Sequence, residues 1–220
     1  RKGALDHYDT IFMVGAFQDA EIRQTEALYD LPQKKLLPVG YGLMEDLQAD
    51  YDALPDAPHD RPLVLIAPSW QQDNILDSCI DPLLEGLLGH GWDVTVRPHP
   101  EYMKRYPQRM EAIRGRWADY KGDDLRFECD FTSSTSIFAS DAVISDWSGT
   151  AYGVALVATR PAVFIDTPPK INNPEYDRIK ARPLELTLRD QAGVRIAPEK
   201  IDTACEVVRT LLADRMRWRE

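Results

Sequence analysis

A polar segment between two apolar runs has the residue types that bind anions. The segment Ser145–Thr150, SDWSGT, combines three hydroxyl groups, a carboxylate and a glycine. If a helix begins near Ser148, its first backbone N–H groups have no partner within the helix, and the helix dipole places about half a positive charge there. A phosphate fits such a place, and Gly149 lets it approach the backbone closely. The alternative is that Ser148 or Asp146 only caps the helix, which is the commoner use of these residues.

The second polar segment, RPHP, spans Arg97–Pro100. A proline on either side restricts the backbone around His99, and the Arg97 guanidinium can bind a phosphate through two parallel hydrogen bonds. These features favour an anion site with a proton donor, although a histidine hydrogen-bonded inside a turn would show the same pattern. Ser69 and Trp70 follow a further apolar run, and the indole is suited either to stacking on a base or sugar or to covering the core.

Short apolar runs alternate with amphipathic stretches along most of the chain. The runs predict β-strands in the ranges 10–15, 34–42, 63–70, 92–100, 125–130, 141–146 and 161–166. The amphipathic stretches predict helices in the ranges 18–29, 75–88, 107–120, 131–140 and 149–158, and a final helix from Ile201 onward. Pro82 predicts a kink or a late start within 75–88. Such alternation is typical of an α/β fold, here a Rossmann-like parallel sheet with helices on both faces and the remnant of a second domain.

The polar segments all follow predicted strands. In an open parallel sheet the carboxyl ends of the strands lie at one edge, where the following loops meet and ligands bind. We therefore expect four segments to meet at that edge, which becomes the predicted anion site: Ser69–Trp70, Arg97–Pro100, Ser145–Thr150 and Asp166–Thr167.

Composition restricts the classes of function. The 220 residues carry 36 acidic and 26 basic side chains, a net charge of -10, which disfavours a protein that wraps nucleic acid. Three dispersed cysteines show no metal-binding spacing and favour a reducing compartment, and no pattern requires a metal or another cofactor. No run of about 18 apolar residues and no leader pattern is present, so the predicted location is cytoplasmic. The motifs of P-loop enzymes, classical dinucleotide dehydrogenases, α/β-hydrolases and zinc proteases are also absent.

Two stretches stand out by composition. Basic side chains are concentrated between Arg97 and Arg116. Such a stretch could bind an anionic polymer or a lipid headgroup surface, so peripheral contact with the inner face of the cell membrane is also expected. A solvated helix face explains that stretch equally well. Residues 48–62, rich in proline, aspartate and alanine, predict a linker between a first domain, 1–47, and a second, 63–220. The chain begins with Arg1, which predicts a fragment.

The order of three segments resembles a known family. The segments LVLIAPSW, VRPHP and SDAVISDWSGTAYGVALVATRPAVFID resemble the carboxyl-terminal half of the CDP-glycerol glycerophosphotransferases, the teichoic-acid primases and polymerases with a two-domain GT-B fold. The resemblance implies that 1–47 ends an acceptor domain and that 63–220 binds the nucleotide donor. It places Ser69, Trp70, His99 and Asp146–Ser148 in donor-binding positions. Trp147 and Gly149 stand where the family usually has a tyrosine and a second serine.

The resemblance implies a transferase that moves glycerol phosphate, or a similar group, from a CDP-linked donor to a hydroxyl group of a polyol-phosphate or glycan acceptor. The setting would be cell-wall or capsular polymer synthesis in the cell envelope. Arg97, His99 and the amides of Ser148–Thr150 would hold the diphosphate, and His99 would donate a proton to the leaving phosphate. The catalytic base is expected upstream of Arg1. Two alternatives stay open, a GT-B nucleotide-sugar glycosyltransferase or epimerase and a non-catalytic anion-binding module.

Overall fold

The computed structural model describes residues 2–54, 60–171 and 173–214. The chain forms two compact units. Unit 1 comprises Arg1–Asp46 and Lys170–Leu188, and unit 2 comprises Leu47–Pro169 and Arg189–Glu220. The four polar segments predicted at strand ends all belong to unit 2, so the candidate site lies within this unit.

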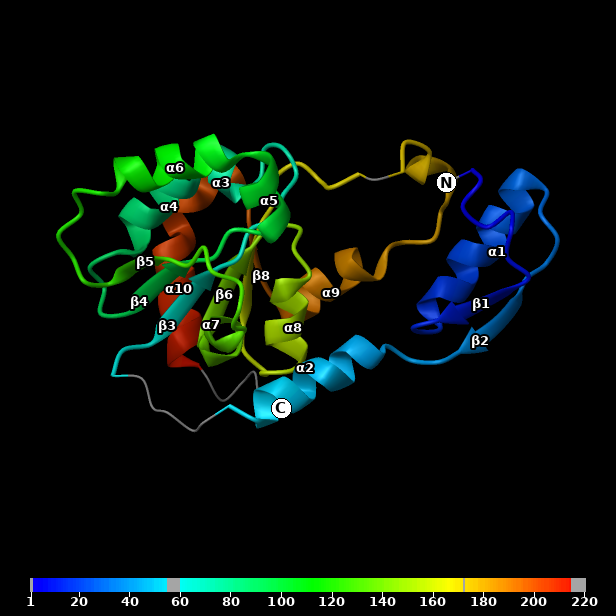
Figure 1. Ribbon diagram of the computed structural model, residues 1–220, viewed down its shortest axis with the longest axis horizontal. Helices are drawn as coiled ribbons and strands as arrows, with labels where there is room; N and C mark the ends of the chain where they lie inside the picture. The colour runs from blue at the N-terminus through cyan, green and yellow to red at the C-terminus, as the bar shows by residue number, and fades with distance from the viewer. Residues whose placement is uncertain (1, 55–59, 172, 215–220) are drawn as a thin grey trace. The chain divides into compact units, whose positions relative to one another are not determined.

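Unit 2 is built on a six-stranded sheet whose strands are all parallel (Figure 1). The strand order is β5-β4-β3-β6-β7-β8. The chain adds strands outward from β3 on one side and outward from β6 on the other, so the order reverses between these two central strands. The strands are β3 (Leu63–Ile66), β4 (Asp93–Val96), β5 (Leu125–Phe127), β6 (Ala142–Ser145), β7 (Ala162–Ile165) and β8 (Gly193–Ile196).

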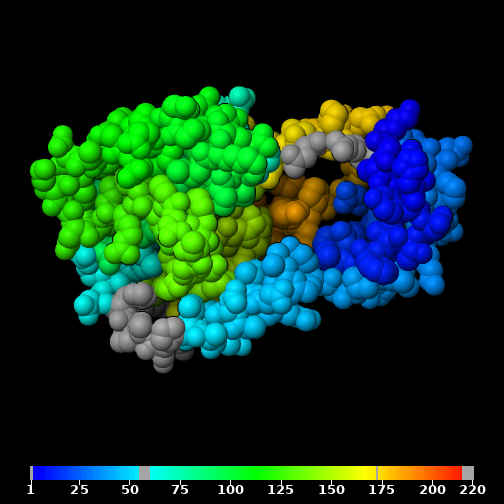
Figure 2. Space-filling model, in the orientation of Figure 1, coloured from blue at the N-terminus to red at the C-terminus, as the bar shows by residue number. Residues whose placement is uncertain are grey.

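Helices cover both faces of this sheet because successive strand residues point to opposite faces. Val64 and Ile66 pack in the core of one face, whereas Leu65 packs in the core of the other. The predicted α/β fold with helices on both faces is thereby confirmed. In Figure 2, α5 and α6 form part of the green surface. The first face carries α3 (Ile75–Ser78), α4 (Ile80–Leu87), α5 (Pro100–Arg105), α6 (Pro107–Arg116) and α10 (Ala204–Ala213), and the second carries α7 (Thr135–Ala139), α8 (Thr150–Leu156) and α9 (Leu184–Ala192).

Unit 1 contains a parallel pair of strands connected by a helix. The returning segment 170–188 is hydrogen-bonded to that helix, since the Gln24 side chain accepts from the backbone N–H groups of Lys180 and Ala181. None of the residues of the candidate site belongs to this unit. Its elements are β1 (Thr10–Met13), α1 (Phe17–Tyr29), β2 (Lys35–Pro38) and the short 3-10 helix η1 (Tyr176–Arg178).

The predicted strands are confirmed, and the helices differ from prediction in particular places. The predicted helix 75–88 divides at Cys79 into α3 and α4, which confirms the kink or late start predicted from Pro82. Pro82 lies in the first turn of α4, where no helical N–H bond is lost. The predicted final helix starts as a 3-10 segment, η2 (Pro198–Thr203), and its residues 215–220 lie outside the described residues. The sequence patterns did not predict α5, α9, β8 or the helix at 42–52.

The division between the units can be compared with the predicted domains. It falls after Asp46, close to residue 47, where the first domain was predicted to end, and residues 170–188 return to unit 1. Residues 48–52 of the predicted linker belong to α2 (Gly42–Asp52), and residues 55–59 of that linker lie outside the described residues. The acceptor and donor roles of the two parts stay predictions.

Candidate functional site

The candidate site lies where the loops after β3 and β6 meet. The two strands are neighbours with Ile66 opposite Ile144, so the loops 67–74 and 146–149 leave the sheet side by side. In an open α/β sheet, the place where the strand order reverses is a crevice at the carboxyl ends of the strands, and ligands bind there. The chain has this reversal of strand order between β3 and β6, and the side chains of the two loops decide what this edge of the sheet can do.

Asp146 ties the two loops together. One carboxylate oxygen, Oδ1, accepts hydrogen bonds from the backbone N–H groups of Ser69 at 2.7 Å and Trp147 at 2.6 Å, and Oδ2 accepts from Ile75 N–H at 3.1 Å. The Thr167 hydroxyl lies 3.5 Å from Oδ2. Asp146 is 1% exposed. A buried carboxylate with this set of donors serves to position the loops, and it does not offer these lone pairs to a ligand.

The loop after β3 is fixed at several further points. The Ser145 hydroxyl donates to the Ala67 carbonyl at 2.6 Å, which links this loop to the end of β6. Asn74 is fully buried and caps α3, because its side-chain oxygen accepts from the N–H groups of Leu76 and Asp77. An asparagine just before an apolar helical stripe is a cap signal, so the sequence alone could have identified Asn74.

Ser69 and Trp70 lie in this loop, and both have intramolecular contacts. The Ser69 hydroxyl donates to the side-chain oxygen of Gln71 at 2.9 Å, and the Gln71 side-chain amide donates to the Pro168 carbonyl at 3.2 Å. The Trp70 ring packs against the core on one side, and the Arg105 guanidinium lies 4.7 Å from its centroid. The indole therefore covers the core, as one of the two interpretations of the sequence proposed.

The loop after β6 leads directly into α8. The helix begins at Thr150, within one residue of the predicted range 149–158. Neither proposed cap forms a short hydrogen bond to the first N–H groups of α8. The Ser148 hydroxyl lies 3.4 Å from the Thr150 nitrogen, and the Asp146 carboxylate accepts from Ser69 N–H instead. Within the described part of the chain, no group accepts a hydrogen bond from the N–H of Ser148 or Gly149. Gly149 is exposed and has a helical φ of -63°.

His99 stands at the end of β4 and caps α5. Its Nδ1 accepts a hydrogen bond from Glu101 N–H at 3.0 Å, and Pro100 occupies the first position of the helix. Because Nδ1 is an acceptor here, the proton of the neutral imidazole lies on Nε2. β4 is the parallel neighbour of β3, so the loop that carries His99 leaves the sheet at the same edge as the loop that carries Asp146. The cap thus fixes the orientation of the ring.

Tyr102 holds this helix against α3. Its fully buried hydroxyl donates to Asp77 Oδ1 at 2.7 Å, which joins α5 to the helix capped by Asn74. Burial, reinforced by the Asp77 carboxylate, raises the pKa of Tyr102 above its usual value. The phenol therefore stays a donor at neutral pH and keeps the His99 turn in place.

Arg97 does not join these residues. Its guanidinium forms an ion pair with Glu128 at 2.8 Å and donates to the Ser133 carbonyl at 2.8 Å and the Ser136 hydroxyl at 3.2 Å. These partners follow β5, which borders β4 on the side away from β3. Arg97 was expected to bind a diphosphate beside His99, and the structure instead brings it to the 128–136 segment, because the buried guanidinium requires an anionic partner.

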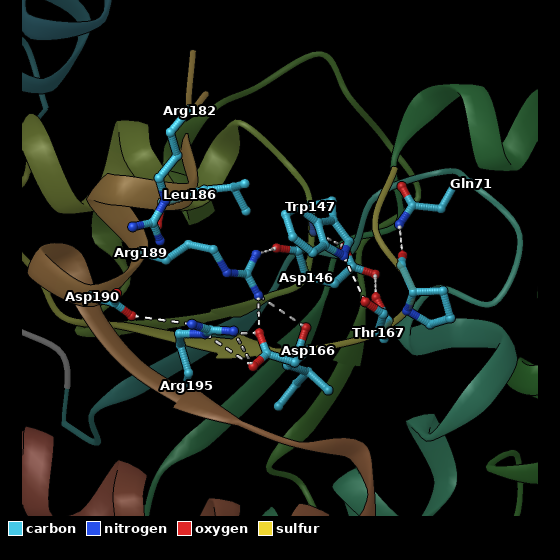
Figure 3. A network of polar contacts seen from close by, with 12 residues as sticks. Gln71, Asp146, Trp147, Asp166, Thr167, Arg182, Leu186, Arg189, Asp190 and Arg195 are labelled. Carbon is cyan, nitrogen blue, oxygen red and sulfur yellow. Dashed lines mark hydrogen bonds and ion pairs between the residues drawn. The ribbon is translucent and has the colours of Figure 1, made fainter. Parts of the chain in front are cut away.

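Arg189 is a residue of the site that the sequence patterns did not single out. Arg189 is 1% exposed and donates to the carbonyl oxygen of Asp146, and it pairs with Asp166 at 2.7 Å (Figure 3). The Trp147 indole N–H donates to the Thr167 carbonyl at 2.9 Å in the same network. The sequence patterns placed Asp166 at this edge of the sheet but indicated no function for it. Arg189 lies in α9, a helix that was not predicted. An arginine at an inward position of an amphipathic stretch was the available signal.

The basic stretch 97–116 does not form an unpaired positive face. Each of its cations has an acidic partner within the described residues. The surface pairs are Lys104 and Arg105 with Glu101, Arg109 with Asp77, Arg114 with Glu111, and Arg116 with Asp81. This arrangement agrees with the solvated-face interpretation. Among the described residues, no helix has the length and apolar character needed to cross a membrane.

No protein-family model matches the sequence, and no curated protein matches it at a significant level. Solved structures do match, at 13 to 15% sequence identity. A variant of the wall teichoic acid polymerase TagF matches with a TM-score of 0.50 over 96% of this chain and 52% of that chain. The Methanocaldococcus jannaschii UDP-GlcNAc 2-epimerase, solved with UDP-GlcNAc and UDP, matches with a TM-score of 0.52 over 93% and 54%. A sucrose-phosphate synthase from Thermosynechococcus elongatus matches with a TM-score of 0.52 over 97% and 51%.

These similarities define the class of fold. The six-stranded parallel sheet flanked by helices matches half of a GT-B enzyme. The chain spans about half the length of each of the three solved structures. The fold is shared by a polymerase, an epimerase and a synthase, so it does not by itself distinguish among these activities.

Proposed function

We propose that unit 2 binds a nucleotide-diphosphate-linked donor at the junction of β3 and β6. The proposed reaction is transfer of glycerol phosphate from a CDP-linked donor to an acceptor hydroxyl group in the synthesis of a cell-envelope polymer. The observation that carries the proposal is the Asp146 carboxylate, which holds two loops together at the reversal of strand order. Loops fixed in this way provide a preorganised surface, which electrostatic catalysis requires.

The diphosphate would lie against the backbone N–H groups of Ser148 and Gly149, with the Thr150 hydroxyl beside them. The Nε2–H of His99 would donate to the phosphate from the other side. Neighbouring strands lie about 4.8 Å apart, so the ends of β4 and β6, which flank β3, are separated by roughly 10 Å. A nucleoside diphosphate is long enough to bridge that separation.

In this reaction the acceptor oxygen forms a bond to the distal phosphorus of the donor. The bond between that phosphorus and the bridging oxygen breaks, and CMP leaves with the electron pair. The acceptor hydroxyl loses its proton to a base outside the residues named here. The His99 Nε2–H and the two amides stabilise the negative charge that accumulates on the leaving phosphate.

The proposal revises some of the expected roles. We assign Ser69 and Asp146 to positioning the loops, Trp70 to covering the core and Arg97 to holding the 128–136 segment, because their polar or ring contacts are intramolecular. The polymerase named above supports the glycerophosphate reaction because it shares the fold. The epimerase structure, with UDP-GlcNAc and UDP, supports a nucleotide-sugar reaction as the second candidate, since it matches equally well.

Calorimetric titration with CDP-glycerol and UDP-GlcNAc separates the candidates. Binding of CDP-glycerol with at least tenfold preference supports the proposed reaction, and the opposite preference supports the second candidate. His99→Ala should weaken binding of the preferred donor by about tenfold or more, because it removes a hydrogen bond to a charged group. If neither nucleotide binds the native protein, a non-catalytic module becomes the better account.

A further inference from the structure

The peptide unit between Asp146 and Trp147 is held at both of its polar atoms. Its carbonyl oxygen accepts from Nη1 of Arg189, and its N–H donates to the Asp146 carboxylate at 2.6 Å. A peptide unit is planar, so two bonds at opposite ends fix the orientation of the plane. That orientation sets the direction of the next peptide units, which carry the N–H groups of Ser148 and Gly149.

The Trp147 side chain is held by the same arginine. The Arg189 guanidinium lies 4.2 Å from the centroid of the Trp147 ring and 4.7 Å from that of the Phe164 ring, so the cation contacts both aromatic rings. The indole N–H donates to the Thr167 carbonyl at the end of β7. Residue 147 is therefore immobilised through its backbone and its side chain.

The rest of the guanidinium is anchored to β7. Nη2 donates to Asp166 Oδ1 at 2.7 Å and lies 3.4 Å from the Ile165 carbonyl oxygen. Asp166 also pairs with Arg195 through its other oxygen, Oδ2, at 2.9 Å (Figure 3). Arg195 is 45% exposed, and its ion pairs are with Asp166 and Asp190. Asp166 thus pairs with two arginines, the buried Arg189, which is bonded to the Asp146 carbonyl, and the exposed Arg195, whose ion pairs do not involve the loop after β6.

We infer that Arg189 is the positioning residue of the Trp147–Gly149 loop. Its planar fork of donors reaches the end of β6 and the end of β7 at once, and it aims the amides that the proposed function assigns to the diphosphate. Lysine, which carries a point charge on a flexible stem, cannot make these contacts together. The inference rests on the proposed function only for the identity of the ligand.

Hydrogen exchange without ligand tests the positioning itself. Arg189→Lys keeps the charge, Arg189→Met removes it, and Arg195→Met is the matched control because it removes the other partner of Asp166. We expect the amides of peptides covering 145–152 to exchange about tenfold to a hundredfold faster in both Arg189 variants, since a charge-assisted hydrogen bond is lost, and to be unchanged in Arg195→Met. Unchanged exchange in a folded Arg189→Lys, or equal acceleration in Arg195→Met, would overturn the inference.

A spectroscopic signature accompanies the loss of the stacked guanidinium. The Trp147 emission is obtained by subtracting the spectrum of each Trp147→Phe counterpart, and it should move to longer wavelength in Arg189→Lys as water reaches the ring. No shift in that difference spectrum counts against the inference. If Arg189→Met does not fold, Arg189→Lys alone decides both measurements.

CDP-glycerol titration then tests the consequence for binding. The affinity of Arg189→Lys should fall about tenfold to a hundredfold relative to the native protein, with Arg195→Met unchanged. Equal affinity of Arg189→Lys and the native protein refutes the inference for the donor site. If the native protein does not bind CDP-glycerol, the proposed function fails, and the exchange and fluorescence results still decide whether Arg189 positions the loop.

Discussion

Replacement of Gly149 by alanine should raise stability and lower donor affinity at the same time. The backbone at Gly149 has φ -63° and ψ -20°, which any residue adopts, and an added Cβ would meet no heavy atom within 4 Å. Alanine at a compatible position stabilises the folded state by about 0.4–1 kcal/mol, because it reduces the conformational entropy of the unfolded chain. The space that the methyl group would fill is the space in which the diphosphate is proposed to approach the backbone.

The cost to binding can be estimated from the contact that would be lost. A methyl group at residue 149 keeps a phosphate from the adjacent N–H groups, and one hydrogen bond to a charged group contributes about 1.5–3 kcal/mol. The dissociation constant of CDP-glycerol should therefore rise about tenfold to a hundredfold. Calorimetric titration gives this constant, and urea unfolding of the same samples gives the stability.

Gly86→Ala is the matched control. Gly86 lies in α4, and an added Cβ there also meets no heavy atom within 4 Å. This variant should gain up to about 1 kcal/mol of stability from helix propensity and leave the affinity unchanged. If Gly149→Ala is stabilised and binds CDP-glycerol as tightly as the native protein, the donor does not contact the backbone at residue 149, and the proposed placement of the diphosphate is wrong.

Three further perturbations test the framework of the site. Asp146→Ala leaves three N–H groups without an acceptor, two of them buried, and should lower the free energy of unfolding by at least about 3 kcal/mol in urea titrations. A loss below about 1 kcal/mol would contradict the role of Asp146 in joining the loops after β3 and β6. Tyr102→Phe removes the bond to Asp77 and should cost about 1.5–3 kcal/mol, measured in the same way. Burial acts to raise the pKa of Asp124, but bonds from the Tyr120 hydroxyl and a backbone N–H outweigh it, so the pKa is lowered. The resulting stability is present above the unfolded pKa of about 3.9 and is lost as the pH falls through the folded value, and Asp124→Asn should flatten this part of the stability–pH curve.

The order of strands and helices could be predicted because it depends on local patterns. Apolar runs such as Leu63–Ile66 and Ala162–Ile165 are buried on both faces of the sheet, and the sequence signal for such strands is strong. The strand β8, GVRI, has only one fully buried side chain, Ile196, and its signal is correspondingly weak. Pro82 predicted a kink or a late start within 75–88, and the structure has a second helix start at Ile80. The exact position of the break, Cys79, could not be predicted because a single apolar stripe runs across α3 and α4.

The sequence by itself determined that polar segments follow the strands, because a parallel sheet brings all carboxyl ends to one edge. The tertiary structure decided which of these segments meet and which side chains remain available. Arg97 and His99 are two residues apart, yet the arginine turns to Glu128 beyond β5, whereas the histidine caps α5. Arg189 lies 43 residues from Asp146 and still fixes the loop after β6. The physical reason is that a buried charge must find its partner in space, and the chain's order does not specify where that partner will be.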